Sequence, residues 1–153
     1  MKRGSDARCF GIAWVAGWAV AVFLPSGLIA WDRLPAGGFA LRRLAADSWH
    51  VADAMAPGAK LMLGGLLLAL FLLADRLGPG ERMAGVLGAI AGLTAMLLTL
   101  LLIPAEWSRG FGTGLTGERL PMGLLPFYLG GAAVAGVVRA LSAARCRAAL
   151  GRG

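Results

Sequence analysis

The chain has 153 residues, of which 58% are hydrophobic and 15% charged, and its formal net charge is +7. The charged residues are gathered between long apolar runs, a pattern that is typical of membrane proteins and not of a soluble domain with one core. The composition therefore excludes a soluble enzyme and predicts an integral membrane protein built from helices.

The first apolar run extends from Cys9 to Ala30 without a charged residue. A helix of roughly 20 residues crosses a hydrocarbon layer of about 30 Å, so this run is long enough to span a membrane. The basic start Met-Lys-Arg also resembles the start of a signal peptide, but Trp14 and Trp18 lie within the run and no small-x-small cleavage site closes it. We therefore expect an uncleaved first span over residues 9–30.

Residues 31–53 are expected to form the first outer loop. After the turn-forming stretch RLPAGG, the sequence FALRRLAADSWHVADAM has two faces at helical spacing. Arg43, Asp47 and His50 lie on the polar face, and the apolar face contains Leu41, Leu44, Ser48, Val51 and Met55. This pattern predicts an amphipathic helix in the membrane interface, with Trp31 and Trp49 as headgroup anchors.

Three further runs predict spans over residues 54–74, 83–105 and 120–138. In the first of these, Lys60 must reach the interface and Pro57 is tolerated in the first turn of the helix. Pro121 and Pro126 lie near the start of the last run, where neighbouring helices can satisfy the freed backbone groups. The predicted fold is all-α: one membrane domain over residues 1–153, a four-helix bundle with a short interfacial helix between the first and second spans.

The orientation of these spans follows from the distribution of Lys and Arg. With the N-terminus inside, the cytoplasmic side has nine basic residues, which are Lys2, Arg3, Arg8, Arg76, Arg82, Arg139, Arg145, Arg147 and Arg152. The other side has six, which are Arg33, Arg42, Arg43, Lys60, Arg109 and Arg119. This bias favours both termini in the cytoplasm. The high content of Ala, Gly and Arg is typical of a GC-rich bacterium, which suggests the inner membrane.

Residues 139–153 are expected to form a basic cytoplasmic tail. The tail could bind anionic lipid headgroups, or it could serve only to fix the topology. Nucleic acid is not an expected partner, because the basic residues lie on both sides of the membrane and no basic stripe alternates with aromatic residues. Cys9 and Cys146 fall on the cytoplasmic side, where thiols stay reduced, and we assign them no role.

Glycines indicate how the helices pack, because small residues let membrane helices approach closely. There are 24 in the chain. Those expected at helix contacts are Gly85, Gly88 and Gly92 in the third span, and Gly123 and Gly130 at the fourth. Such faces could form internal contacts, or they could dock a partner subunit or a second copy of the chain.

Polar residues are concentrated in the two outer loops. Arg43, Asp47 and His50 could contact one another, and Glu106 and Arg109 in the loop 106–119 could lie opposite them. Together these residues would form a small charged pocket for a headgroup, phosphate or sugar. The alternative is that Asp47 caps a helix starting at Ser48, His50 is solvated, and Glu106 and Arg109 are ordinary loop charges.

Other chemistries have no motif in this sequence. A single histidine cannot supply both axial ligands of a transmembrane haem, so no cofactor is expected, and no zinc, hydrolase, nucleotide or thiol motif occurs. No charged residue lies within a predicted span except Lys60 at its edge, which disfavours a transporter or pump. We therefore expect no catalytic residue and no metal site.

The arrangement of these polar residues resembles the VanZ-like family of small bacterial membrane proteins. The resemblance rests on the four spans, on Asp47 and His50 just before the second span, and on Glu106 directly after the third. Arg109 stands where the family has Gln, and the family's Asp and Asn at the last helix are replaced by apolar residues around Leu125 and Leu129. The resemblance implies four helices and an envelope function, without a defined activity.

Two functions are consistent with the sequence. The first is a VanZ-like envelope protein that binds a lipid-linked or cell-wall component at the outer polar cluster of Arg43, Asp47, His50, Glu106 and Arg109. The second is a small non-catalytic accessory subunit that packs by its glycine faces against a larger membrane complex. Membrane lipids are expected partners of either.

Overall fold

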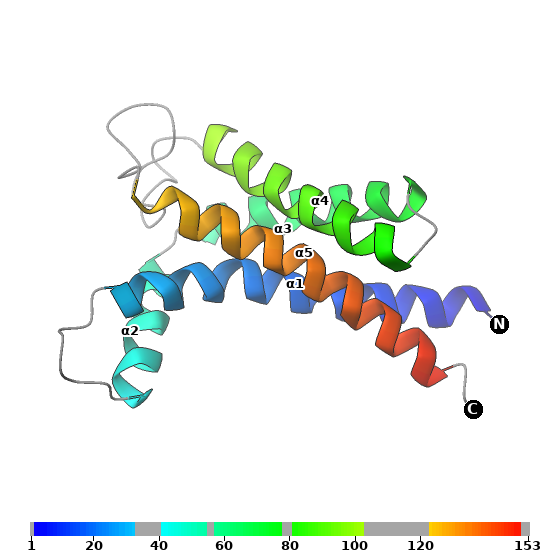
Figure 1. Cartoon of the computed structure of the whole chain (residues 1–153), viewed down its shortest axis with the longest axis horizontal. Coiled ribbons are helices and arrows are strands. Elements are labelled where there is room, and N and C mark those ends of the chain that lie inside the picture. The colour runs from blue at the N-terminus through cyan, green and yellow to red at the C-terminus, as the bar shows by residue number, and fades with distance from the viewer. Residues whose placement is uncertain (1, 33–40, 55–56, 78–80, 103–122, 151–153) are drawn as a thin grey trace.

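The computed structural model describes residues 2–32, 41–54, 57–77, 81–102 and 123–150, which form five helices (Figure 1). They are α1 (Lys2–Asp32), α2 (Leu41–Ala54), α3 (Pro57–Leu77), α4 (Glu81–Leu102) and α5 (Leu125–Leu150). All except α2 are long and apolar enough to cross a membrane, and no strand occurs in the described ranges. The predicted all-α bundle, with a short helix between its first and second spans, is confirmed.

The helix boundaries differ from the predicted spans most clearly in α5. This helix begins at Leu125, after a turn in which the Phe127 and Tyr128 amides donate to the Leu124 carbonyl, and it continues to Leu150. Residues 139–150, expected to be a tail, are therefore part of a helix. The alanine-rich sequence favours helix, and Ala140 and Ala143 are buried in the bundle.

The bundle has two distinct ends (Figure 1). Helix α5 packs along both α1 and α4, while α3 packs against α4 and, over a shorter contact, against α1. Helix α2 packs against α1 at one end of the bundle, here called the α2 end, and both chain termini lie at the opposite end, here called the terminal end. Large apolar side chains such as Ile12, Val86 and Ile90 are exposed around the bundle, as expected of a lipid-facing surface.

The core includes one face of α3 and a set of hydrogen bonds between α3 and α1. Leu63, Leu67 and Phe71 recur every fourth residue of α3, so they share one face, and all three are fully buried. Trp14 and Trp18 of α1 stack with ring centroids 5.6 Å apart, and their indole N–H groups donate at 3.1 Å to the carbonyls of Gly64 and Lys60. The two indole N–H donors therefore have acceptors within the bundle, which the lipid chains around it could not provide.

The glycines predicted at helix contacts fall into two groups. Gly88 and Gly92 of α4 lie against α5 so closely that a Cβ at either position would collide with the backbone of Gly136 or Ala132. No neighbouring atom lies within 4 Å of a Cβ built at Gly85, Gly123 or Gly130. The contact between α4 and α5 therefore requires glycine at two of the five positions, and it also depends on Gly136, whose Cβ would collide with Gly88.

This difference predicts opposite effects of two matched substitutions on α4. Gly92→Ala forces α4 and α5 apart and should lower the free energy of unfolding by about 1–3 kcal/mol, the usual range for overpacking. Gly85→Ala meets open space and should leave stability unchanged or raise it by up to about 1 kcal/mol, because alanine favours helix. Unfolding of the purified protein in detergent measures both, and equal destabilisation by the two variants would contradict this packing.

Candidate functional site

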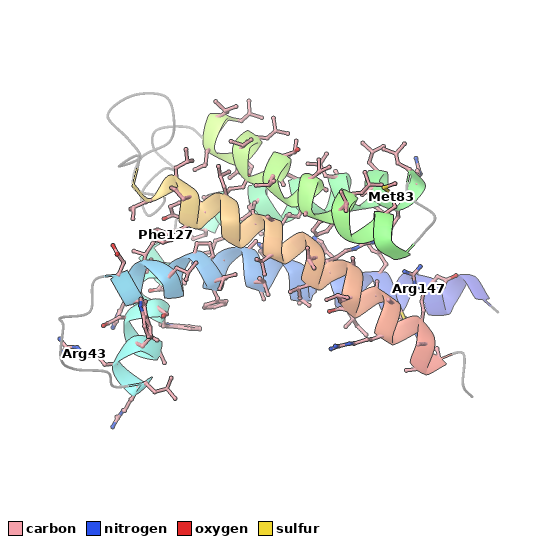
Figure 2. All side chains as sticks on the ribbon, viewed as in Figure 1. Arg43, Met83, Phe127 and Arg147 are labelled. Atoms are coloured by element: carbon pink, nitrogen blue, oxygen red, sulfur yellow. A yellow bond between two sulfur atoms is a disulfide. The ribbon has the colours of Figure 1, made fainter. Side chains whose placement is uncertain are left out.

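Three residues of the predicted polar cluster lie on α2. This helix starts at Leu41, so Asp47 lies in its interior, and the alternative that Asp47 caps a helix starting at Ser48 is wrong. Arg43 and His50 are exposed and Asp47 is half-buried. Arg43 projects away from the bundle (Figure 2). No hydrogen bond or ion pair joins Arg43, Asp47 and His50. Glu106 and Arg109, the other two members of the cluster, lie outside the described residues.

The inner face of α2 packs on α1 through small and aromatic side chains. Ala52 is buried, and the Ser48 hydroxyl donates to the Leu44 carbonyl at 2.6 Å and lies near Gly27 of α1. Trp49 stacks on Phe23 of α1 with ring centroids 5.7 Å apart, although 61% of Trp49 is exposed. An exposed Trp on an amphipathic helix suits a membrane interface.

Between α2, α1 and the start of α3 lies a cavity of about 310 Å³, here called the α2 cleft. Its lining is apolar except for Asp53 and Lys60, and consists of Val15, Trp18, Ala19, Val22, Phe23, Trp49, Ala52, Asp53 and Lys60. The Trp18 indole N–H is already bonded to the Lys60 carbonyl, so it offers the cleft no free donor. Neither Asp53 nor Lys60 forms an ion pair within the described part of the chain. An elongated apolar group with a polar end would complement this cleft.

The terminal end contains a charged pair that the sequence interpretation missed. Arg139 of α5 is only 2% exposed, and its guanidinium donates to both carboxylate oxygens of Asp75 on α3, at 2.6 Å from Nη1 to Oδ1. Its Cζ lies 4.9 Å and 5.3 Å from the ring centroids of Phe10 and Phe71. Arg139 directly follows the predicted span 120–138 but belongs to the same helix, so the absence of charge that disfavours a transporter does not extend over the whole of α5. Arg139 is therefore a buried residue of the bundle and not part of an exposed tail.

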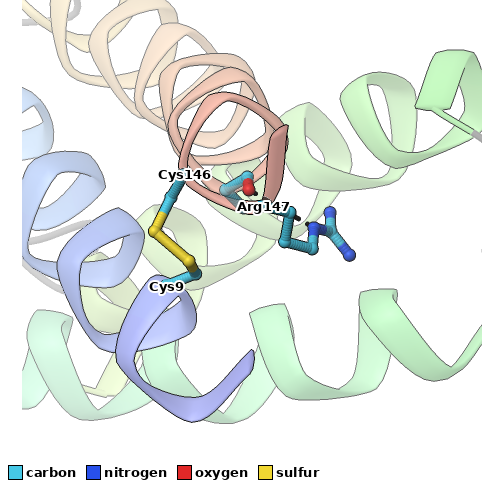
Figure 3. Close-up of a disulfide and its surroundings, with 4 residues drawn as sticks. Cys9, Cys146 and Arg147 are labelled. Carbon is cyan, nitrogen blue, oxygen red and sulfur yellow. Dashed lines mark hydrogen bonds between the residues drawn. A yellow bond between two sulfur atoms is a disulfide. The ribbon is translucent and has the colours of Figure 1, made fainter. Parts of the chain in front are cut away.

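A disulfide bond joins α1 to α5 (Figure 3), and Cys9 lines the same cavity as Asp75 and Arg139. It links Cys9, which is buried, to Cys146, with Cα atoms 5.5 Å apart. The expectation that both thiols are reduced and without a role is therefore wrong. The bond could not be predicted from the spacing of the cysteines, because they are separated by 137 positions and are brought together by the packing of α1 against α5.

The disulfide and the ion pair border a second cavity of about 430 Å³, here called the terminal cavity. Its lining comprises Asp6, Ala7, Cys9, Phe10, Leu72, Asp75, Arg139, Ala143 and Arg147. The Arg147 side chain is held along α5 by a hydrogen bond from Nε to the Ala143 carbonyl at 3.3 Å (Figure 3). Among the described residues, no group of His, Cys, Asp and Glu side chains could hold a metal ion.

The fold and its apolar surface define a multi-pass helical membrane protein, with one apolar cleft at the α2 end and one charged cavity at the terminal end. No family model, curated protein or solved structure matches this chain.

Proposed function

We propose that this protein is a VanZ-like integral membrane protein of the bacterial cell envelope that binds a lipid or lipid-linked component at the α2 end. The observation that carries the proposal is the α2 cleft, an apolar cavity beneath an amphipathic helix, with Lys60 and Asp53 in its lining. The proposal is also supported by the resemblance carried by Asp47, His50 and Glu106.

In the proposed complex, an acyl or isoprenoid chain occupies the apolar part of the cleft against Trp18 and Phe23. Lys60 is half-buried and has no ion-pair partner among the described residues, so its ammonium group is available to a phosphate. Trp49 marks the level of the headgroups. Asp47 and His50 of α2, together with Glu106 and Arg109 of the later loop, contact the rest of the headgroup.

Filling the α2 cleft should prevent lipid binding without disturbing the core. Ala19 is exposed and lines the cleft, so Ala19→Trp places an indole in the space that the chain would occupy. Ala69→Trp on α3 is the matched control, because Ala69 is also exposed and lies outside the cleft. The measurement is covalent labelling by a phospholipid with a photoreactive acyl chain, followed by peptide mapping.

We expect the wild type and Ala69→Trp to be labelled at cleft residues such as Val22, and Ala19→Trp to lose at least about 80% of that labelling while background labelling of α4 is unchanged. Equal labelling of the cleft in all three proteins would reject lipid binding there.

We further propose that both termini face the cytoplasm of the bacterial inner membrane, as the distribution of Lys and Arg favours. The Cys9–Cys146 bond opposes this orientation, because disulfides persist mainly in oxidising compartments.

Ala45 on α2 and Ala148 on α5 are both exposed and lie at opposite ends of the bundle. In a background lacking the native cysteines, a membrane-impermeant maleimide should label Ala45→Cys and not Ala148→Cys in intact spheroplasts. The reverse pattern would place the disulfide outside the cytoplasm.

The accessory-subunit alternative depends on glycine faces that are free to dock a partner. Gly85, Gly123 and Gly130 face open space and could still meet a partner. Gly88 and Gly92 are already in contact with α5, so a partner could use them only by displacing that helix. The α2 cleft needs no such rearrangement, which is why lipid binding is the function we favour.

A further inference from the structure

The guanidinium of Arg139 uses only part of its hydrogen-bonding capacity. Its two terminal nitrogens donate to the Asp75 carboxylate, whereas Nε is buried and has no hydrogen-bond partner within the described part of the chain. A guanidinium has five N–H donors, and the edge formed by Nε and one Nη can bind a second oxyanion in the same bidentate way. A buried donor without a partner costs free energy, so an acceptor at this edge would stabilise the protein.

The surroundings of Arg139 restrict where such an acceptor could come from. Phe10 and Phe71 lie against the guanidinium and Asp75 occupies its outer edge, so these neighbours supply no acceptor for Nε. Arg139 nevertheless lines the terminal cavity, which offers space for a small group. A ligand that enters this cavity meets a guanidinium that Asp75 already holds in position, and it reaches the shielded Nε when the side chains around Arg139 move aside.

The charges around the cavity favour an anion. Arg147 also lines it, and because its Nε is bonded to the Ala143 carbonyl, its remaining N–H groups are free to turn toward a ligand. Arg8, Arg76 and Arg145 are exposed at the same end of the bundle. Two carboxylates oppose this field: Asp75, which is committed to Arg139, and Asp6, which is exposed. The lining itself thus has two carboxylates and two guanidiniums, and the excess of positive charge comes from the exposed arginines Arg8, Arg76 and Arg145 at this end of the bundle.

We propose that the terminal cavity binds a phosphate group, which accepts hydrogen bonds from the free edge of Arg139 and from Arg147. This site lies at the opposite end of the bundle from the α2 cleft and does not depend on the function proposed there. Arginine suits the role because its planar fork matches the oxygens of a phosphate. The phosphate can belong to a lipid headgroup or to a small soluble molecule, since both present the same oxygens.

The test uses the full chain, with its disulfide intact, in nanodiscs of phosphatidylcholine. Inorganic phosphate is titrated by calorimetry, and in a second arm phosphatidic acid is added to the nanodiscs and its retention is measured by native mass spectrometry. The variant is Arg147→Gln and its matched control is Arg145→Gln, which removes an exposed charge two residues away that does not line the cavity. Arg139→Lys keeps the charge next to Asp75 but removes the free edge.

We expect Arg147→Gln to weaken binding about tenfold, Arg145→Gln to change it less than about twofold, and Arg139→Lys to abolish it. Binding of inorganic phosphate with this pattern would identify a soluble ligand, and binding of phosphatidic acid alone would identify a headgroup. Two results would overturn the proposal: no binding of either probe to the wild type, or equal weakening by Arg145→Gln and Arg147→Gln, which would show only attraction to a basic surface. If Arg139→Lys does not fold, the comparison of Arg145→Gln with Arg147→Gln still decides whether phosphate binds in the terminal cavity.

Discussion

Asp75→Ala is expected to lower the free energy of unfolding by about 1–3 kcal/mol, the cost of leaving a buried polar group without its partner, because the pair is only partly buried. The substitution leaves Arg139, which is 2% exposed, without its counterion in an apolar environment. An exposed ion pair contributes only about 0–1 kcal/mol, so the size of the effect reports the burial of the arginine. Unfolding of the purified protein in detergent, followed by circular dichroism, measures it.

The two partners of this pair should not be equivalent. Asp75 is 41% exposed, so in Arg139→Met its carboxylate can still be hydrated, and the loss of stability should be smaller than in Asp75→Ala. In the double variant Asp75→Ala/Arg139→Met no buried charge remains, and stability should recover to near that of Arg139→Met alone. Additive losses in the double variant would show that the two residues act independently.

Removal of the disulfide is expected to cost about 2–4 kcal/mol, the typical contribution of such a bond. The bond closes a loop between residues separated by 137 positions, and a long loop gives a large entropic effect in the unfolded state. The unfolded chain of a membrane protein still crosses the bilayer, and this constraint keeps the expected value below that for a free chain of the same length. The measurement is the shift in thermal unfolding between the oxidised wild type and Cys9→Ala.

Three controls separate the bond from the side chains that form it. Cys146→Ala should lose as much stability as Cys9→Ala, and the double variant should lose no more, because each change breaks the same bond. A reductant should destabilise the wild type by a similar amount and leave the variants unchanged. If reductant does not change the stability of the wild type, the ends of α1 and α5 are held together by packing alone.

The two ends of the bundle thus differ in what holds them. At the terminal end, α1, α3 and α5 are joined by a disulfide and a buried ion pair, so this end is expected to be rigid. At the α2 end, stacked aromatic rings and small side chains leave the α2 cleft between the helices. A cleft held by packing can adjust to a flexible apolar chain, whereas a cavity lined by a fixed guanidinium favours a ligand of defined shape.

The positions of Asp75 and Arg139 in the sequence nearly allowed the ion pair at the terminal end to be predicted. Asp75 directly follows the second apolar run and Arg139 directly follows the fourth. Alternating spans bring these two ends to the same side of the membrane, so opposite charges there were available as a signal. The sequence interpretation ended each span at the charge, because a charged residue marks the end of an apolar run unless a partner is known.

The four candidate spans, their order and the short amphipathic helix between the first two could be predicted from the sequence, because apolar length and helical periodicity are properties of a local stretch of chain. The glycines that lie at contacts could not be identified in this way, because Gly85 and Gly92 both belong to α4, yet Gly85 faces open space and Gly92 lies against α5. The tertiary structure alone paired Cys9 with Cys146 and brought Asp75 to Arg139. Such pairings depend on how far each helix continues and how it crosses its neighbours, and these are set by side-chain packing between segments distant in the chain.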